Sequence, residues 1–432
     1  MFSLANDIWA QNNGTPRWGA LMNSDVLPKL LDPEVELDPY AFYRDLRARS
    51  PVHFDESVGA YLITRHSDVS ACYRNPAFST QNYAWQLEPI MGRTMLQLDG
   101  REHARVRGLL TPAFRGHGLS NWLGVVESNV TAILDGTVQR TLDFLLARFR
   151  PGDEVDIVSA FGRYYPVFVI ADMLALPKED HGRFYGWYCA QTAFVSNLAR
   201  DPIIDAEGVA ATRDLAEYLA PFVRYRRESP GADLISLLAT SKIDGRFLED
   251  TEVITHATHL LNAGSETTDR TLANLLTHLL SDRARFEEVR EDRTLIAAAI
   301  SETLRFTPPS QMNGRLTTDA LSVAGIDIPP ESLVMLVMAS ANRDERRFID
   351  PETFNMHRTD LDHESAFTGT GEHFAFGYGR HFCLGAQVAQ LEIRASLTAF
   401  LDRFPEMHLA DGYVPRSRGI KMRSPVEVRV VL

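Results

Sequence analysis

Cys383 is the residue of this chain whose surroundings most clearly suggest chemistry. It stands in the segment FGYGRHFCLG, residues 376–385, which holds Gly377, Gly379 and Gly385. Glycines at this density let the backbone pass close to a flat or bulky partner. A helical pattern follows from residue 386 to 401, and the amides and dipole at a helix entrance favour a thiolate and lower its pKa. A thiolate is both a nucleophile and a metal ligand, so the local pattern leaves these two roles open.

The other two cysteines carry no such context. Cys72 and Cys189 are far apart in the chain, and no Cys-x-x-Cys pair is present. This predicts neither a disulfide framework nor a zinc site, and it fits a reducing cytoplasm. We expect both residues to be inert parts of the packing.

Two pairs of side chains have the spacing of neighbours on one helix face. His103 and Arg107 are four residues apart, so both can reach one carboxylate. Glu302 and Arg305 are three apart and can pair with each other. Each pair by itself is a weak signal, because charged residues at this spacing usually form a solvated face.

A long helix should carry the segment AGSETT, residues 263–268. Asp250 or Thr251 can cap it, and apolar residues recur from 253 to 279 at helical spacing. A carboxyl group and a hydroxyl, as at Glu266 and Thr267, can relay protons through water. The alternative is a threonine that bonds back to its own helix, which is common for isolated threonines.

The remaining patterns predict one large, mainly helical unit with a minor sheet and no linker between independent domains. We expect an irregular lead-in over 1–35, a helix over 39–49, a hairpin over 52–65, a long loop over 80–93, mostly helix over 117–290, a helix over 293–306, short strands within 315–340 and a strand over 426–430.

Charge and hydropathy exclude several classes of protein. The 432 residues carry a formal net charge of −13, which argues against a nucleic-acid partner. No apolar run reaches the roughly 18 residues that a membrane span requires, and the N-terminus lacks a signal-peptide pattern. We therefore expect a cytoplasmic protein with no membrane anchor.

The Cys383 segment resembles the haem-binding loop of the cytochrome P450 family, whose pattern FGxGxHxCxG it matches. The resemblance implies a mainly α fold with minor β, a single cytochrome P450 fold over 36–432, and haem between the long central helix and the cysteine loop. Cys383 would be the iron ligand, with Phe376, Gly377 and Gly385 of the same loop as further haem-binding residues.

Further motifs extend the resemblance over most of the chain. It implies that His103 and Arg107 bind a haem propionate, and that Arg315 and His381 are further propionate donors. Ala263 and Gly264 would lie against the haem, where a mid-helix glycine has a reason. Glu266 and Thr267 would deliver the protons that cleavage of dioxygen requires. Glu302 and Arg305 match the family's ExxR, with Arg358 as third member, and their role would be structural.

The implied activity is that of a monooxygenase that inserts one atom of O2 into a small organic substrate. Its cofactor would be haem b (heme b, iron protoporphyrin IX). No room for a fused reductase follows Cys383, so a separate ferredoxin and ferredoxin reductase are expected. The alternatives are a peroxygenase driven by H2O2 and a non-catalytic haem sensor or carrier. The acid–alcohol pair argues against both.

The substrate pocket is the least defined part of this interpretation. Its candidate lining residues are Tyr83, Trp85, Phe194, His259, Asn262, Gln311 and Met312. Each of them could equally be a core residue. Together they suit a substrate that has both apolar surface and polar groups.

Overall fold

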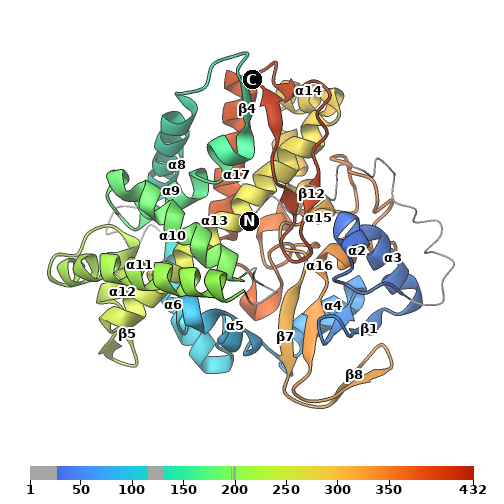
Figure 1. Ribbon diagram of the computed structural model, residues 1–432, viewed down its shortest axis with the longest axis horizontal. Helices are drawn as coiled ribbons and strands as arrows, with labels where there is room; N and C mark the ends of the chain where they lie inside the picture. The colour runs from blue at the N-terminus through green and yellow to red at the C-terminus, as the bar shows by residue number, and fades with distance from the viewer. Residues whose placement is uncertain (1–26, 115–129, 196, 198–200) are drawn as a thin grey trace.

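The computed structural model describes residues 27–114, 130–195, 197 and 201–432, and helices dominate this part of the chain (Figure 1). The elements as far as residue 195 are α2 (Pro33–Leu37), α3 (Pro39–Arg49), β1 (Val52–Asp55), β2 (Ala60–Ile63), α4 (His66–Arg74), β3 (Phe78–Ser79), α5 (Asn82–Met91), α6 (Gly100–Phe114), α8 (Val130–Leu146), β4 (Glu154–Asp156), the π-helical turn η1 (Val158–Gly162), α9 (Tyr165–Met173), the 3-10 turn η2 (Lys178–Asp180) and α10 (His181–Val195).

The elements between residues 202 and 336 are α11 (Pro202–Glu228), α12 (Leu234–Thr240), β5 (Lys242–Ile243), β6 (Arg246–Phe247), α13 (Asp250–Leu280), α14 (Arg283–Glu291), α15 (Leu295–Phe306), β7 (Asn313–Thr317), β8 (Leu321–Val323), β9 (Ile326–Ile328) and β10 (Leu333–Leu336). The last elements are α16 (Met338–Ala341), the 3-10 turns η3 (Ser365–Phe367) and η4 (Gly379–His381), α17 (Ala386–Arg403), β11 (His408–Leu409), β12 (Ser417–Arg418), β13 (Ser424–Pro425) and β14 (Arg429–Val431).

Helix α13 crosses the middle of the molecule (Figure 1). Its 31 residues include the whole apolar range predicted from 253 to 279, but the cap lies one residue earlier than expected, at Glu249. Glu249 and Glu252 form a reciprocal capping box, which satisfies two otherwise free amides. Leu272, Leu275 and Leu276 of its second half lie in a core that α8, α9, α15 and α17 also enter. Because helices surround it, α13 also buries polar residues, among them His259, Asn262 and Thr268.

Five of the strands form the largest sheet of the described chain, on the side of the molecule opposite α8–α12 (Figure 1). Its order is β1-β2-β10-β7-β3, in which only β10 and β2 run parallel. The predicted hairpin is confirmed as β1 and β2, and Gly59 adopts a φ of 59° between them. This left-handed conformation favours glycine.

The prediction of a loop over residues 80–93 is wrong, because α5 occupies Asn82–Met91. Pro89 lies inside this helix, and the exposed Trp85 gives no apolar periodicity. The buried face of α5 is formed by Leu87, Ile90 and Met91, which pack against Phe194 of α10. Tertiary contact therefore stabilises a helix that the local sequence does not specify.

The other predicted elements that lie within the described residues are confirmed in type. The helix predicted over 293–306 is α15, which ends before the two prolines at 308 and 309. The strands expected within 315–340 are β7 to β10, and the C-terminal strand is β14. Of the expected lead-in, residues 1–26 lie outside the described part, and α2 begins at Pro33.

Candidate functional site

Cys383 lies in a tight connection between η4 and α17. Its backbone amide donates to the Phe376 carbonyl at 2.9 Å, which closes the loop on itself. Gly377 and Gly379 adopt φ values of 69° and 71°, a conformation that side chains disfavour. Helix α17 begins at Ala386, so the predicted helix entrance is present.

The acidity of Cys383 differs from the prediction. Burial raises the pKa of this thiol, while the Gly385 amide and the guanidinium of Arg107 act in the opposite direction. The helix entrance is therefore outweighed by the loss of solvent around the sulfur. A bound metal cation is what would make the thiolate the stable form, because a coordinating thiol is deprotonated.

The predicted pair on α6 meets the cysteine loop. Arg107 donates from Nη2 to the Phe382 carbonyl at 2.6 Å, so it reaches the residue before Cys383. His103 is buried, and its Nε2 has no hydrogen-bond partner among the described residues. The His103 and His381 rings lie 4.1 Å apart between centroids.

Basic side chains from three elements gather at this point. The pKa of His103 is lowered to about 4, chiefly by burial and also by the nearby His381 and Arg107. Burial also lowers the pKa of His381, although its hydrogen bond to the Asp99 carboxylate acts in the opposite direction, and Arg315 lowers it as well. Arg315 itself is buried on β7 and donates from Nη1 to the Gly314 carbonyl at 2.7 Å. The concentration of basic groups favours an anionic ligand.

Asp99 is a member of this cluster that the sequence did not indicate. Its Oδ1 lies 3.3 Å from Nε2 of His381, and its Oδ2 accepts from the Ser79 hydroxyl at 2.6 Å and the Thr80 amide at 3.1 Å. Despite burial, which acts in the other direction, these bonds hold the pKa of Asp99 well below its usual range. The carboxylate orients His381, but the two residues are 282 positions apart, so no local pattern signals the contact.

The AGSETT segment lies in the middle of α13, as predicted. Ala263 is exposed although Asn262 before it and Ser265 after it are buried. A Cβ added at Gly264 would lie 2.9 Å from side-chain atoms of Ile170, so this glycine permits close packing of α13 on α9. The contact of Gly264 with a bound cofactor stays a prediction, while its missing side chain makes room for Ile170.

Three hydroxyls around Thr267 bond back to the helix, but that of Thr267 does not. Ser265 donates to Leu261, Thr268 to Gly264 and Thr271 to Thr267, each to a carbonyl at 2.7 to 3.2 Å. Among the hydrogen bonds of the described chain, none involves the Thr267 hydroxyl. It is half-buried and free to bond a ligand or water.

The carboxylate of Glu266 is held by Arg270, one turn along α13. Arg270 donates from Nε and Nη2 to Oε1 of Glu266 at 3.0 and 2.7 Å. Its remaining Nη1 donates to the Ser424 hydroxyl of β13 at 3.1 Å. Arg270 is a residue that the sequence analysis missed, although its i, i+4 spacing to Glu266 was a usable signal.

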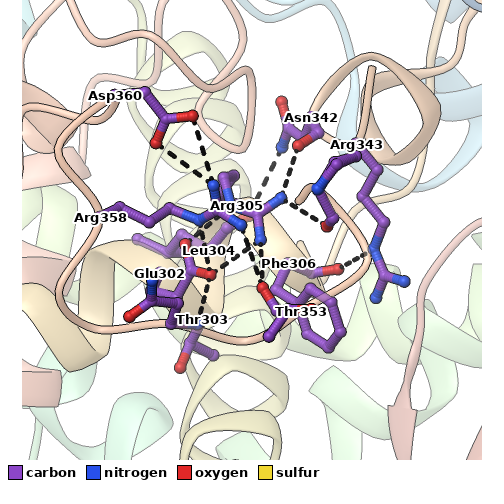
Figure 2. Close-up of polar contacts among 12 residues, drawn as sticks. Glu302, Thr303, Leu304, Arg305, Phe306, Asn342, Arg343, Thr353, Arg358 and Asp360 are labelled. Atoms are coloured by element: carbon purple, nitrogen blue, oxygen red, sulfur yellow. Dashed lines mark hydrogen bonds and ion pairs between the residues drawn. The ribbon is translucent and has the colours of Figure 1, made fainter. Parts of the chain in front are cut away.

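Glu302, Arg305 and Arg358 come together as a buried ion cluster beneath the chain that leads to the cysteine loop (Figure 2). Arg305 donates to both oxygens of Glu302 at 2.7 and 2.8 Å, and Nε of Arg358 donates to Oε1 at 2.9 Å. Both arginines also bond backbone carbonyls: Arg305 those of Asn342, Pro351 and Thr353, and Arg358 those of Ile349, Asp350 and Thr353.

The expected pocket residues fall into different surroundings. Tyr83 and Phe194 lie in one apolar cluster between α5 and α10. Trp85 is 62% exposed and points away from that cluster's buried core. Met312 lies instead in a core with α3 and β2 residues, so its place is structural.

Three polar pocket candidates are buried and incompletely bonded. His259, Asn262 and Gln311 each keep one side-chain atom without a partner among the described residues. Burial lowers the pKa of His259 to about 4, so this ring is neutral at pH 7. Gln311 donates to the Pro308 carbonyl at 2.6 Å, and Asn262 bonds Gln191 of α10.

Within the described residues, no helix is long and apolar enough to cross a membrane.

Comparison with known proteins places these features in one family. The model of the cytochrome P450 family matches residues 194–416. Pulcherriminic acid synthase of Bacillus subtilis (strain 168) is 33% identical over 412 residues, which is 95% of this chain and 99% of that protein. Nocardicin C N-oxygenase of Nocardia uniformis subsp. tsuyamanensis is 33% identical, covering 92% of this chain and 96% of its own length. The structure of cytochrome P450 CYP109Q5 from Chondromyces apiculatus superposes with a TM-score of 0.81 at 28% identity, covering 94% of this chain and 97% of that one.

Proposed function

Because this chain belongs to the cytochrome P450 family, we propose that it holds a haem between α13 and the Cys383 loop, with Cys383 as the iron ligand. The family is one of monooxygenases, and this chain is a cytochrome P450 monooxygenase. The observation that carries the residue assignment is the contact of Arg107 with the Cys383 loop and the packing of the His103 ring against that of His381 beside it.

The residues present fit an iron porphyrin. Ala263 is exposed in the middle of a helix, between the buried Asn262 and the half-buried Gly264, so a flat ligand can lie against it. The buried Nε2 of His103 has no partner, and it stands among basic groups that suit propionate carboxylates. A thiol at the entrance of α17 supplies the sulfur ligand.

In this proposal each side chain has a separate task. Arg107, His103, Arg315 and His381 hold the propionates. Thiolate-ligated haem iron, when bound, supplies the activation of O2 and the cleavage of the O–O bond. Glu266, held by Arg270, and the free hydroxyl of Thr267 beside it are the acid–alcohol pair that would relay protons to the site.

The cluster of Glu302, Arg305 and Arg358 is proposed to be structural. Its two arginines bond five different backbone carbonyls between residues 342 and 353. The cluster therefore stabilises the chain that precedes the cysteine loop, without contact to a substrate.

We further propose haem b, a separate ferredoxin with its reductase, and a cytoplasmic location. The chain lacks the Cys-x-x-Cys-His pattern of covalent haem attachment, which supports a non-covalent haem. A substrate from natural-product biosynthesis is supported by the names of the relatives, a pulcherriminic acid synthase and a nocardicin C N-oxygenase.

The test is the absorption spectrum of haem-supplied protein with Cys383 intact and with Cys383→Ser. The native protein is expected to give a ferric thiolate-haem spectrum and the carbon monoxide difference band of that ligation. Cys383→Ser should lose that signature, while Cys189→Ser, at an exposed cysteine, should keep it. A native protein that folds but takes up no haem would refute the proposal.

A further inference from the structure

A chain of hydrogen bonds joins four helices beside Ala263. The Thr212 hydroxyl of α11 reaches the Ile90 carbonyl of α5 at 2.9 Å. Nε2 of Gln191, on α10, donates to the Thr212 hydroxyl at 2.8 Å. Nδ2 of Asn262, on α13, donates to Oε1 of Gln191 at 2.5 Å.

The direction of this chain is determined by its backbone ends. The Thr212 hydroxyl lies within reach of two carbonyls, that of Ile90 at 2.9 Å and that of Gly208 at 3.1 Å. Both can only accept, so its hydrogen is used on them and its oxygen must accept from Gln191. The oxygen of Gln191 then faces Asn262, which must present its amino group. The same Nδ2 also donates to the Thr258 carbonyl at 3.1 Å, which only a donor can do. The orientation of the Asn262 amide is thus determined twice.

The remaining atom of Asn262, its Oδ1, is an acceptor without a partner. It is buried, and no described residue donates to it. Buried polar atoms are nearly always bonded, because an unpaired one loses its interaction with water and gains nothing in return. An acceptor oriented by three other residues on three other helices therefore calls for a donor that the described residues do not supply.

The surroundings of this acceptor indicate what kind of molecule brings the donor. Ala263, the next residue of α13, is exposed. An apolar cluster of Leu87, Ile90, Met91 and Phe194 lies along the same helices α5 and α10. One turn earlier on α13, the neutral ring of His259 also keeps a buried Nδ1 without a partner.

We propose that Oδ1 of Asn262 accepts a hydrogen bond from the substrate, and that the substrate is a largely apolar molecule with an N–H or O–H donor. This rests on the proposed function, since it takes the substrate to lie beside Ala263. Gln191 and Thr212 are positioning residues, because they act through the orientation of Asn262. A site of this kind rejects an analogue that lacks the donor, because its acceptor is then left unpaired.

The test measures binding by the haem-loaded protein with matched pairs of compounds. Menthol is compared with its methyl ether, and N-cyclohexylbenzamide with its N-methyl derivative. Affinity is taken from the shift of the ferric spectrum and from calorimetry, which detects binding that leaves the iron unchanged. The variants are Asn262→Leu and, remote from the ligand, Thr212→Val.

Donor-bearing members should bind the native protein about tenfold more tightly than their methylated partners. Asn262→Leu should abolish that preference while the methylated compounds keep their affinity. Thr212→Val should reduce the preference without changing haem uptake, an effect that a loss of pocket shape alone would not produce. A native protein with less than about threefold preference across both pairs, or one that binds neither donor, overturns the inference. So does a preference that survives in Asn262→Leu. Failure of the proposed function would be distinct, since the thiolate-haem spectrum itself would then be absent.

Discussion

Replacing Arg358 by leucine removes a guanidinium whose side chain is 2% exposed and which bonds Glu302 of α15 and four groups of the chain before the cysteine loop, among them the Asp360 carboxylate at 3.2 Å. It donates to Glu302 at 2.9 Å, to the Ile349 and Asp350 carbonyls at 2.6 and 2.8 Å, and to the Thr353 carbonyl at 3.0 Å. Leucine keeps part of the volume and none of these bonds (Figure 2).

The magnitude follows from what remains unpaired. Removing one partner of a buried ion pair costs about 3–5 kcal/mol, because the other charge stays buried. Here Glu302 keeps both bonds from Arg305 and the bond from the Asn355 amide at 2.8 Å. Its charge therefore remains partly compensated, but three backbone carbonyls lose a charged donor. We expect the free energy of unfolding to fall by about 3 kcal/mol.

The assay is urea unfolding of the haem-loaded protein, followed by circular dichroism and by the thiolate-haem absorption. The matched control is Arg394→Leu, since Arg394 is exposed on α17 and its loss should change stability by less than about 0.5 kcal/mol. The haem signal of Arg358→Leu should be lost at a lower urea concentration than that of the control. A loss of less than about 1 kcal/mol, or one equal to the control, would refute the reasoning that this cluster stabilises the loop.

Three further outcomes are expected. Glu266→Gln keeps the shape of the side chain and removes its acid group. Product formation should fall about 100-fold while substrate affinity is kept. An unchanged rate would exclude Glu266 from the proton relay. Burial lowers the pKa of His278 and of His373 to about 3, below the value in the unfolded chain. On acidification the unfolded chain therefore binds protons before the folded protein does. The free energy of unfolding should be highest above about pH 6.5 and should fall as the pH is lowered. Urea titrations from pH 7 to pH 5 should show this loss, by up to about 1.4 kcal/mol per pH unit for each residue, and His373→Gln should make the dependence shallower. We expect the proposed ferredoxin to dock near the half-buried Arg380, which precedes Cys383, and the exposed Arg394 of α17. Charge reversal at both should then slow reduction by a ferredoxin about tenfold at low salt. Equal rates would place the docking surface elsewhere.

The elements that the sequence determined are those whose information is local. The length of α13, the stop of α15 before two prolines, and the hairpin at Gly59 each follow from periodicity and turn residues within the element. The Cys383 loop belongs to the same class, because its glycines and its helix entrance lie within ten residues. Helix α5 does not, since its stability comes from contact with α10, and the sequence there indicated a loop.

Only the tertiary structure decided which side chains complete the site. Asp99 orients His381 from 282 residues away, and Ser424 holds Arg270 from 154 residues away. The open oxygen of Asn262 exists because Gln191 and Thr212 come from two other helices. Burial also reversed the expected acidity of Cys383, which a helix entrance alone would have lowered. Helical and strand patterns depend on neighbouring residues in the sequence. The hydrogen-bond partners of a side chain and its loss of contact with water depend instead on which distant segments the packed core brings together.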